Sequence, residues 1–506
     1  MARKALISVA DKTGALELGK SLVELGWELI SSSGTAKMFR EAGVQVTEVS
    51  DITKFPHILG GRVKTLHPLI FGGILARRSL ESDTKDMEEY GISGIDMVVV
   101  NLYPFEKTAR SGANLDDLIE NIDIGGVALI RAAAKNYRYV TVLTDPSEYS
   151  AVVEEIKAEG EVTLKTRSKL ALKAFDTTAR YDATIGEGLR REMGEEISDE
   201  FFTLPLVRAQ ELRYGENPHQ KASVYLPPLV DSPVKQLAGK ALSYNNLLDL
   251  DAAMRATSML QSSIGAVVIK HTTPCGMAIG NSVEDAYDRA FACDSLSAYG
   301  GVVGVTRHID LAAAQSISKH FTEVLLCPSI DDDALALLKA KRKNLRIMLW
   351  KGGRVSEKQI VSTWSGFLMQ SDKLAPLPDL NKGHWIGTPR PDLWDDLVLA
   401  WKVAAVSKSN AVAMVKNGEA VGIGMGFCSR VFAVEFAAHQ AGEKAKGAVM
   451  ASDAYFPFPD GVEKAAEAGV VAIIQPGGSI RDGEVAKRAE ELGVSMFISG
   501  NRTFRH

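Results

Sequence analysis

Short apolar runs alternate with amphipathic stretches from Ala5 to Glu192. The apolar runs have the length of buried strands, whereas the stretches between them repeat apolar residues at helical spacing. This alternation favours a parallel sheet with helices on both faces. The predicted strands are Ala5–Val9, Trp27–Ile30, Met97–Asn101 and Val140–Leu143, and the predicted helices are Ala15–Leu25, Ala36–Ala42, Leu115–Glu120 and Val127–Ala134.

A change of pattern predicts a domain boundary near residue 197. Thr166–Glu192 is helical in pattern, and an acidic polar stretch, Glu195–Glu200, follows it. A chain of 506 residues also exceeds the ~250–300 residues at which single cores stop growing. We therefore expect two α/β domains, 1–197 and 198–506. Strands of the second are predicted at Ala266–Ile269, Gly301–Val305 and Val470–Ile474, with an irregular connection at Ser371–Pro391.

Composition narrows the classes of partner. The net charge of −5 provides no field that would attract a nucleic acid, so a small-molecule substrate is favoured. No apolar run is long enough for a membrane span or a signal peptide. The four cysteines form no C-x-x-C pair, which disfavours a structural zinc site and a disulfide framework. These features predict a reduced, cytoplasmic protein.

Three loops in the first part have the composition of anion-binding sites. Ser31–Thr35 (SSSGT) and Asp123–Gly126 (DIGG) each lead into a predicted helix, whose free N–H groups attract phosphate. An ordinary helix cap and turn is the alternative for both. Arg62–Pro68 (RVKTLHP) places two cations, a hydroxyl and an imidazole beside Gly60 and Gly61. It lacks the glycine spacing of a Walker A loop, and a solvated basic loop is its alternative.

In the second part, Lys270 and His271 follow an apolar strand, where a proton-transfer pair can face a ligand. A structural histidine is the alternative. Arg213–Gln220 (RYGENPHQ) is rich in hydrogen-bonding groups, and Pro476–Ser479 is a turn able to face an anion. Gly422–Gly426 (GIGMG) lacks the spacing of a dinucleotide fingerprint, so a glycine-rich strand is expected there. Pro274 and Cys275 do not complete a deaminase zinc motif.

Longer strings resemble the bifunctional AICAR transformylase/IMP cyclohydrolase family. SVADKTG from Ser8, GGRVKTLHP from Gly60, NLYPF from Asn101 and DIGG…RAAAKN from Asp123 are similar to its cyclohydrolase domain. The transformylase domain is resembled by LRYGENPHQ from Leu212, LSYNNLLDLDAA from Leu242, IKH..PCG from Ile269, SDAYFPF from Ser452, QPGGSIRD from Gln475 and the terminal FRH. The strings cover the whole chain in the family's order.

This resemblance implies a methylglyoxal-synthase-like N-terminal domain, which is a doubly wound parallel sheet. It implies an internally duplicated, cytidine-deaminase-like C-terminal domain without zinc. The implied reactions are formyl transfer from 10-formyltetrahydrofolate to the amine of 5-aminoimidazole-4-carboxamide ribonucleotide (AICAR), and closure of the formylated product (FAICAR) to inosine monophosphate (IMP). The implied assembly is a homodimer through the transformylase domain. No catalytic metal is implied, and a monovalent cation is left open.

The resemblance also implies residue roles in formyl transfer. The attacking amine is a poor nucleophile, so a base and a cation near the developing oxyanion are expected. His271 is the implied base, and Lys270 stabilises the oxyanion or protonates the leaving folate nitrogen. The implied binding residues are Arg213, Tyr214, Asn410, Arg430, Tyr455, Asp460, Ser479, Arg502 and Phe504.

Ring closure is intramolecular, so the enzyme chiefly holds a reactive conformer and balances charge. Lys64 and Lys135 are the implied oxyanion stabilisers, Asp123 handles a proton or orients the amide, and Tyr103 completes the catalytic set. The implied nucleotide-binding residues are Ser8, Lys12, Ser32, Thr35, Arg62, Thr65, Gly125 and Gly126.

Several positions depart from the family's pattern, mostly in the transformylase part. They leave open two alternatives to the bifunctional enzyme: an enzyme with cyclohydrolase activity alone, and a nucleotide-binding protein without catalysis. The intact Lys270-His271 pair argues against the second. The departures are Thr273, Phe427, Cys428, Pro459, Asn501 and Thr503.

Overall fold

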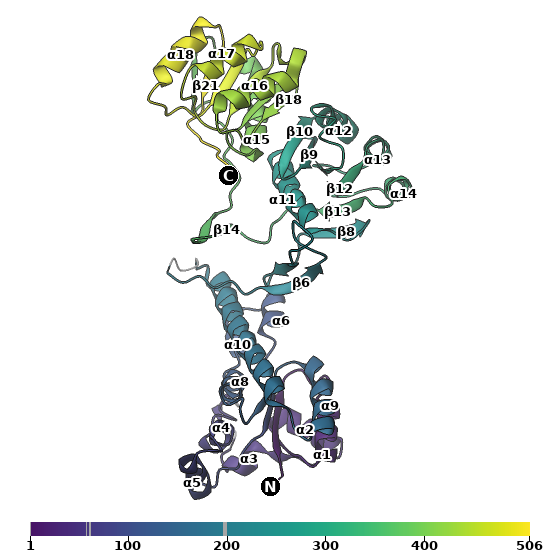
Figure 1. Cartoon of the computed structure of the whole chain (residues 1–506), viewed down its shortest axis with the longest axis vertical. Coiled ribbons are helices and arrows are strands. Elements are labelled where there is room, and N and C mark those ends of the chain that lie inside the picture. Colours follow the sequence, from purple (N-terminus) through teal and green to yellow (C-terminus); the bar gives the residue numbers. More distant parts are fainter. Residues whose placement is uncertain (1, 57, 60–61, 196–199) are drawn as a thin grey trace. The chain divides into compact units, whose positions relative to one another are not determined.

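The computed structural model describes residues 2–56, 58–59, 62–195 and 200–506 (Figure 1). The chain forms two compact units. Unit 1 comprises Met1–Val207 with Pro227–Val230, and unit 2 comprises Arg208–Leu226 with Asp231–His506. The predicted boundary at residue 197 lies outside the described residues. No helix in the described ranges is long and apolar enough to cross a membrane.

Unit 1 is built on a five-stranded parallel sheet in the order β3-β2-β1-β4-β5. The four predicted strands are confirmed, and β3 is a two-residue addition that the hydrophobic pattern did not indicate. Apolar side chains of the sheet are buried against helices that pack on it, which explains the strands' nearly continuous apolar runs. The strands are β1 (Lys4–Val9), β2 (Glu28–Ser31), β3 (Thr47–Glu48), β4 (Met97–Asn101) and β5 (Thr141–Leu143).

The helices of unit 1 include the 30-residue α10, which Figure 1 shows as its longest element. The Thr163 hydroxyl accepts a hydrogen bond from the Thr166 N–H at its start, and Gly194 ends it in a left-handed conformation. The helices are α1 (Ala15–Glu24), α2 (Ser33–Glu41), α3 (Val49–Thr53), α4 (Pro68–Leu75), α5 (Glu81–Glu89), α6 (Phe105–Arg110), α7 (Leu115–Glu120), α8 (Gly125–Lys135), α9 (Tyr149–Glu159) and α10 (Leu164–Met193).

The strand order of unit 1 fixes where a ligand can bind. From β1 the chain proceeds outward to β2 and β3, and it returns to the other side of β1 for β4 and β5. The order therefore reverses between β1 and β4. Ligands of such sheets bind at the carboxyl ends of the strands beside this reversal.

Unit 2 contains a twelve-stranded mixed sheet made of two equivalent halves. Each half follows the same course, with parallel and antiparallel neighbours in the same places. The first half is β8 (Val234–Ala238), α11 (Tyr244–Met259), β9 (Gly265–Lys270), β10 (Thr273–Ile279), α12 (Val283–Ala292), β11 (Gly301–Val305), α13 (Leu311–Ile317), β12 (Thr322–Cys327), α14 (Asp332–Lys341) and β13 (Arg346–Trp350).

The second half repeats this course element by element, so the duplication implied by the family resemblance is confirmed. β10 and β18 join the halves as antiparallel neighbours, with Ala278 opposite Glu419. The elements of the second half are β16 (His384–Ile386), α15 (Trp394–Val406), β17 (Val412–Lys416), β18 (Glu419–Gly424), α16 (Arg430–Ala441), β19 (Val449–Ser452), α17 (Asp460–Glu467), β20 (Ala472–Gln475), α18 (Asp482–Glu491) and β21 (Ser495–Ile498).

Two hairpin-like pairs lie outside the large sheet: β6 (Val207–Leu212) with β7 (Ala222–Leu226), and β14 (Lys358–Thr363) with β15 (Gly366–Ser371). The irregular connection predicted at Ser371–Pro391 contains no helix or strand between β15 and β16, but it also includes the three-residue strand β16, which the pattern did not indicate. The predicted strand at Val470–Ile474 begins two residues later, as β20.

Helices α11 and α15 share one hydrophobic core with both halves, whereas the other face carries a separate core for each half. Glycines permit the close packing on that second face. A Cβ on Gly424 of β18 would lie 1.9 Å from the Ala433 carbonyl oxygen of α16, and one on Gly276 of β10 would lie 1.9 Å from the Ala290 carbonyl oxygen of α12. The glycine-rich run Gly422–Gly426 is therefore a packed strand and its following turn, as expected.

Candidate functional site

A cavity of about 500 Å³ lies in unit 1 where the carboxyl ends of β1, β2 and β4 meet the first turn of α8. Its position is the one that the reversal of strand order predicts. Most of the cyclohydrolase residues expected from the sequence line it: Ser8, Lys12, Ser32, Thr35, Arg62, Lys64, Thr65, Tyr103, Asp123, Gly125 and Gly126.

Hydroxyl groups line the β1 and β2 side of the cavity. The Ser8 and Ser32 hydroxyls lie 3.1 Å apart, and the Thr35 hydroxyl lies 3.2 Å from the carbonyl oxygen of Val9. A Cβ on Gly34 would lie 3.7 Å from Lys12 Nζ, which places that ammonium against the start of α2. Hydroxyls, an ammonium group and a helix N-terminus together suit a phosphate.

Asn101, at the end of β4, holds the loop that carries Lys12. Its Oδ1 accepts hydrogen bonds from the backbone N–H groups of Ala10 (2.7 Å) and Asp11 (2.9 Å), and its Nδ2 donates to the Asp11 carbonyl (2.7 Å). Asn101 was not among the predicted site residues. A polar residue at the end of a buried apolar strand is the feature of the sequence that could have indicated its role.

The Asp123 carboxylate occupies the start of α8. It accepts hydrogen bonds from the backbone N–H groups of Gly126 (2.6 Å) and Tyr103 (3.3 Å). Burial raises the pKa of Asp123, and the same two N–H groups oppose that rise. Burial also raises the pKa of the Tyr103 hydroxyl, to which the nearby carboxylates of Asp123 and Glu120 add. A proton acceptor and a phenol therefore lie together on one wall.

Tyr181 of α10 supports this wall from behind. Its hydroxyl accepts from the Asp123 N–H (3.0 Å) and donates to the Asn121 carbonyl (3.2 Å), while its ring packs edge-on against Phe105. Burial raises the pKa of Tyr181 to about 12, so the hydroxyl keeps its proton at neutral pH. Nothing in the sequence pattern of this long helix singled out Tyr181.

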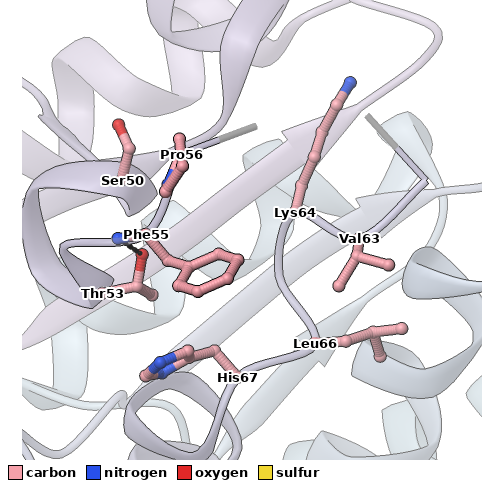
Figure 2. A pocket seen from close by; sticks show the side chains of 8 residues that line it. All are labelled: Ser50, Thr53, Phe55, Pro56, Val63, Lys64, Leu66 and His67. Carbon is pink, nitrogen blue, oxygen red and sulfur yellow. Dashed lines mark hydrogen bonds between the residues drawn. The ribbon is translucent and has the colours of Figure 1, made fainter. Parts of the chain in front are cut away.

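Arg62 and Lys64 supply positive charge from the segment before α4. Arg62 forms an ion pair with Glu120 in which both side chains are exposed, so an incoming anion competes with that carboxylate. Lys64 also borders a small crevice of about 20 Å³ beside Phe55 and His67 (Figure 2). Gly60 and Gly61, which the sequence analysis placed beside these cations, lie outside the described residues.

Two side chains singled out in the sequence lie outside the main cavity. His67 is the N-cap of α4, where its Nδ1 accepts a hydrogen bond from the Leu69 N–H at 3.2 Å, so the imidazole has a structural part. Lys135 is the last residue of α8, about 15 Å along the helix from Gly125. The structure does not bring Lys135 to the cavity, and its catalytic assignment depends on the resemblance alone.

In unit 2, the residues expected for formyl transfer fall into two groups. The first surrounds the turn between β9 and β10. Lys270 ends β9, and its Nζ donates to the Tyr299 carbonyl at 2.8 Å, while His271 is exposed at the turn itself. The loop after β6 is placed in the same group because α11 contacts both segments: Asn245 donates to the Glu216 carbonyl at 3.4 Å, and Asp249 accepts from the Thr272 N–H at 2.6 Å. In that loop the Arg213 guanidinium lies over the Tyr214 ring, 5.3 Å from its centroid.

Both residues of the β9–β10 turn have a left-handed backbone, with φ of 53° at His271 and 64° at Thr272. Such conformations cost of order 1–3 kcal/mol each in residues other than glycine, and they concentrate at functional sites. The strain is an observation independent of any motif. It supports a functional role for this turn.

The second group surrounds a buried ion pair between Arg430, the first residue of α16, and Asp453, which follows β19. Arg430 also donates to Asn410 Oδ1 (2.7 Å) and the Ser452 hydroxyl (2.8 Å). The Asp453 carbonyl accepts from Thr503 N–H (2.9 Å), which fixes the C-terminal segment. Asp453 was not among the predicted site residues, although it lies within the SDAYFPF string.

The remaining predicted residues of this group lie on loops and helix starts of the second half. Arg502 lies over the Phe504 ring, 4.7 Å from its centroid, and both side chains are exposed. Tyr455 and Asp460 are exposed at the start of α17, and the Ser479 hydroxyl accepts from the Arg481 N–H in the turn before α18. Among the described residues, no hydrogen bond or ion pair joins the first group to the second.

The positions that depart from the family's pattern differ in the contacts that they make. The Phe427 carbonyl accepts from Asn410 Nδ2 at 2.9 Å, and the Thr273 hydroxyl donates to the Lys270 carbonyl at 2.8 Å. Pro459 is the N-cap of α17, and Cys428 is exposed. Within the described ranges, no cluster of three or more His, Cys, Asp or Glu side chains is arranged to hold a metal ion.

Comparisons with known proteins cover both units. A family model described as the AICARFT/IMPCHase bienzyme matches residues 133–440, and one described as the MGS-like domain matches residues 14–128. The bifunctional purine biosynthesis protein PurH of Persephonella marina is 47% identical, and that of Bacillus cytotoxicus is 46% identical, each over 100% of both chains. A crystal structure of ForH is 38% identical over 37% of this chain and 98% of its own, with a TM-score of 0.33 that is too low to support an argument.

Proposed function

The chain belongs to the AICARFT/IMPCHase bienzyme family, and we propose how its two units divide the two reactions. It is a bifunctional enzyme of purine biosynthesis. It formylates the 5-amino group of AICAR and then closes the product, FAICAR, to IMP with loss of water. We assign ring closure to unit 1 and formyl transfer to unit 2.

The cavity at the reversal of strand order in unit 1 carries the first assignment. Ser8, Ser32, Thr35 and Lys12 form the wall suited to the nucleotide phosphate. Asp123 and Tyr103 line the same cavity at the start of α8, and we assign them to the carboxamide nitrogen, which must lose a proton as it attacks the formyl carbon. We assign Lys64, which also lines the cavity, to stabilise the oxyanion that develops on the formyl oxygen. Because the attack is intramolecular, holding this geometry supplies most of the acceleration.

The strained β9–β10 turn is the feature that supports the assignment of formyl transfer to unit 2. His271 takes a proton from the amine as it attacks the formyl carbon of 10-formyltetrahydrofolate, and Lys270 stabilises the oxyanion or protonates the departing folate nitrogen. Arg213 and Tyr214 lie in a loop that α11 connects to this turn, and we assign them to the nucleotide. General base catalysis is typically worth ~10²–10⁴-fold, so His271→Ala should be severely impaired.

The assembly and its location are parts of the same proposal. We propose that the protein is a homodimer, as the family resemblance implies, in which subunits complete each other's transformylase sites. We propose 10-formyltetrahydrofolate as the cosubstrate, with no catalytic metal and with a monovalent cation left open. A cytoplasmic location accords with small metabolite substrates.

One assay tests the proposal. Purified protein is given AICAR and 10-formyltetrahydrofolate, and the release of tetrahydrofolate and the formation of IMP are followed together. Equal amounts of both products are expected. Cyclisation of supplied FAICAR without any tetrahydrofolate release would instead restrict the activity to unit 1 with this donor, and would overturn the assignment of unit 2.

A further inference from the structure

The duplication of unit 2 supplies an internal comparison for the strained turn. Lys270 pairs with Thr273 across the β9–β10 hairpin, which leaves His271 and Thr272 as its two loop residues. In the second half, Lys416 pairs with Glu419 across the β17–β18 hairpin, which leaves two equivalent loop residues. These are Asn417, with φ of 54°, and Gly418, with φ of 77°. Positive φ at both loop residues is the signature of a type I′ turn.

The two hairpins differ in how well their residues suit this backbone. Asn-Gly is the pair that type I′ turns favour. His-Thr is poorly suited, because a β-branched residue with positive φ is a conformational outlier. The first half therefore keeps a backbone shape that its own residues oppose, and an external contact must stabilise it.

A carboxylate provides that contact. Asp249 Oδ1, on α11, accepts a hydrogen bond from the Thr272 N–H at 2.6 Å. The equivalent helix of the second half, α15, carries Asp396, which accepts from the N–H groups of Asn417 (2.8 Å) and Gly418 (2.7 Å). Both carboxylates are half-buried. The arrangement is shared by the two halves, but only the first half has a turn that needs it.

The contact bears directly on the reactive pair. Thr272 follows His271, so release of its N–H lets the turn relax and moves both His271 and the end of β9. Two further hydrogen bonds hold Lys270. Its Nζ donates to the Tyr299 carbonyl, and its own carbonyl accepts from the Thr273 hydroxyl. We propose that Asp249 is a positioning residue of formyl transfer, which holds the Lys270–Thr273 turn in its left-handed shape and so aims His271. This inference rests on the assignment of formyl transfer to unit 2.

The test compares variants of the full-length enzyme. Asp249→Ala should lower kcat for formyl transfer by about 10²-fold, because a misplacement of about 1 Å costs this much, while KM for AICAR changes little. Asp249→Asn keeps an oxygen acceptor, so its kcat should fall less than that of Asp249→Ala. Addition of Thr272→Gly to Asp249→Ala should restore most of kcat, because glycine adopts positive φ without help. The matched control is Asp396→Ala, which should leave kcat unchanged because Asn-Gly forms its turn unaided.

A second readout needs no turnover. Amide hydrogen exchange across residues 268–275, measured without substrate, should be faster in Asp249→Ala and slower again in the double variant. Wild-type kcat in Asp249→Ala would overturn the inference, as would a loss of kcat that Thr272→Gly does not recover. Unchanged exchange in Asp249→Ala would overturn it whatever the activity. Absence of formyl transfer in the wild-type protein would instead reject the proposed function, and the exchange experiment would still test the contact.

Discussion

At the scale of single residues, Lys64 lines the unit 1 cavity and is the cation that we propose to stabilise the developing oxyanion. Removal of one such group typically costs about 10²–10³ in kcat. We therefore expect Lys64→Ala to lower cyclisation of supplied FAICAR by that factor. The control is Lys37→Ala, since Lys37 is exposed on α2, pairs with Glu41 and lies outside the cavity. Equal cyclisation rates in both variants would remove Lys64 from the mechanism.

The raised pKa of Asp123 predicts how the rate of FAICAR cyclisation depends on pH. Because burial raises its pKa, the carboxyl takes up a proton at a higher pH than an ordinary aspartate as the solution is acidified. If the ionised form accepts the proton, kcat/KM for FAICAR should fall on the acid side above the usual aspartate range. Asp123→Asn should lower the rate and abolish this limb. A pH–rate profile of both proteins checks it, and an acid limb that persists in Asp123→Asn would assign the limb to another group.

The raised pKa of Asp123 also makes the stability of the folded protein depend on pH. The folded protein binds the Asp123 proton more tightly than the unfolded chain. The carboxylate's burial therefore destabilises the fold at neutral pH, and this cost is relieved as the pH falls through the folded-state pKa. Two backbone hydrogen bonds limit the cost. A buried carboxylate with a raised pKa is typical of functional sites, which accords with the role that we propose for Asp123.

At the scale of elements, the start of α8 depends on a glycine. A Cβ on Gly126 would lie 2.6 Å from Asp123 Oδ2, so the carboxylate would have to shift away from it. Gly126→Ala should lower FAICAR cyclisation by about tenfold to a hundredfold through displacement of Asp123. The control is Gly483→Ala in α18, where the added methyl meets no atom within 4 Å. Normal cyclisation in Gly126→Ala would show that Asp123 can shift without loss.

At the scale of the whole molecule, the separate units predict separable reactions. His271→Ala should retain cyclisation of FAICAR but lose tetrahydrofolate release, and Lys64→Ala should show the converse. A mixture of the two variants should then form IMP from AICAR, because FAICAR made by one protein diffuses to the other. The measurement is IMP formation in the mixture and in each variant alone. A mixture no more active than the separate variants would indicate that the intermediate is not released.

The sequence by itself determined the fold class and most of the unit 1 cavity. Strands such as Ala5–Val9 and Met97–Asn101 are read correctly because burial on both faces leaves continuous apolar runs. Residues of loops that follow such strands, among them Ser32 after β2 and Tyr103 after β4, converge because parallel strands end at one edge of the sheet. Local pattern and a general rule of topology suffice for these features.

Only the tertiary structure decided the rest. Tyr181 reaches Asp123 from 58 residues away, and Asp249 reaches Thr272 from 23, and neither contact follows from periodicity along the chain. The duplication of unit 2 was implied only by the family resemblance and not by any repeat in the sequence, because its halves share strand order and packing rather than residues. Lys135 is the opposite case, a residue that the sequence predicted for the site but that the structure does not bring there. It belongs to the DIGG…RAAAKN string yet lies at the far end of α8. A sequence specifies which groups are present, but distances between remote groups arise only when the chain packs.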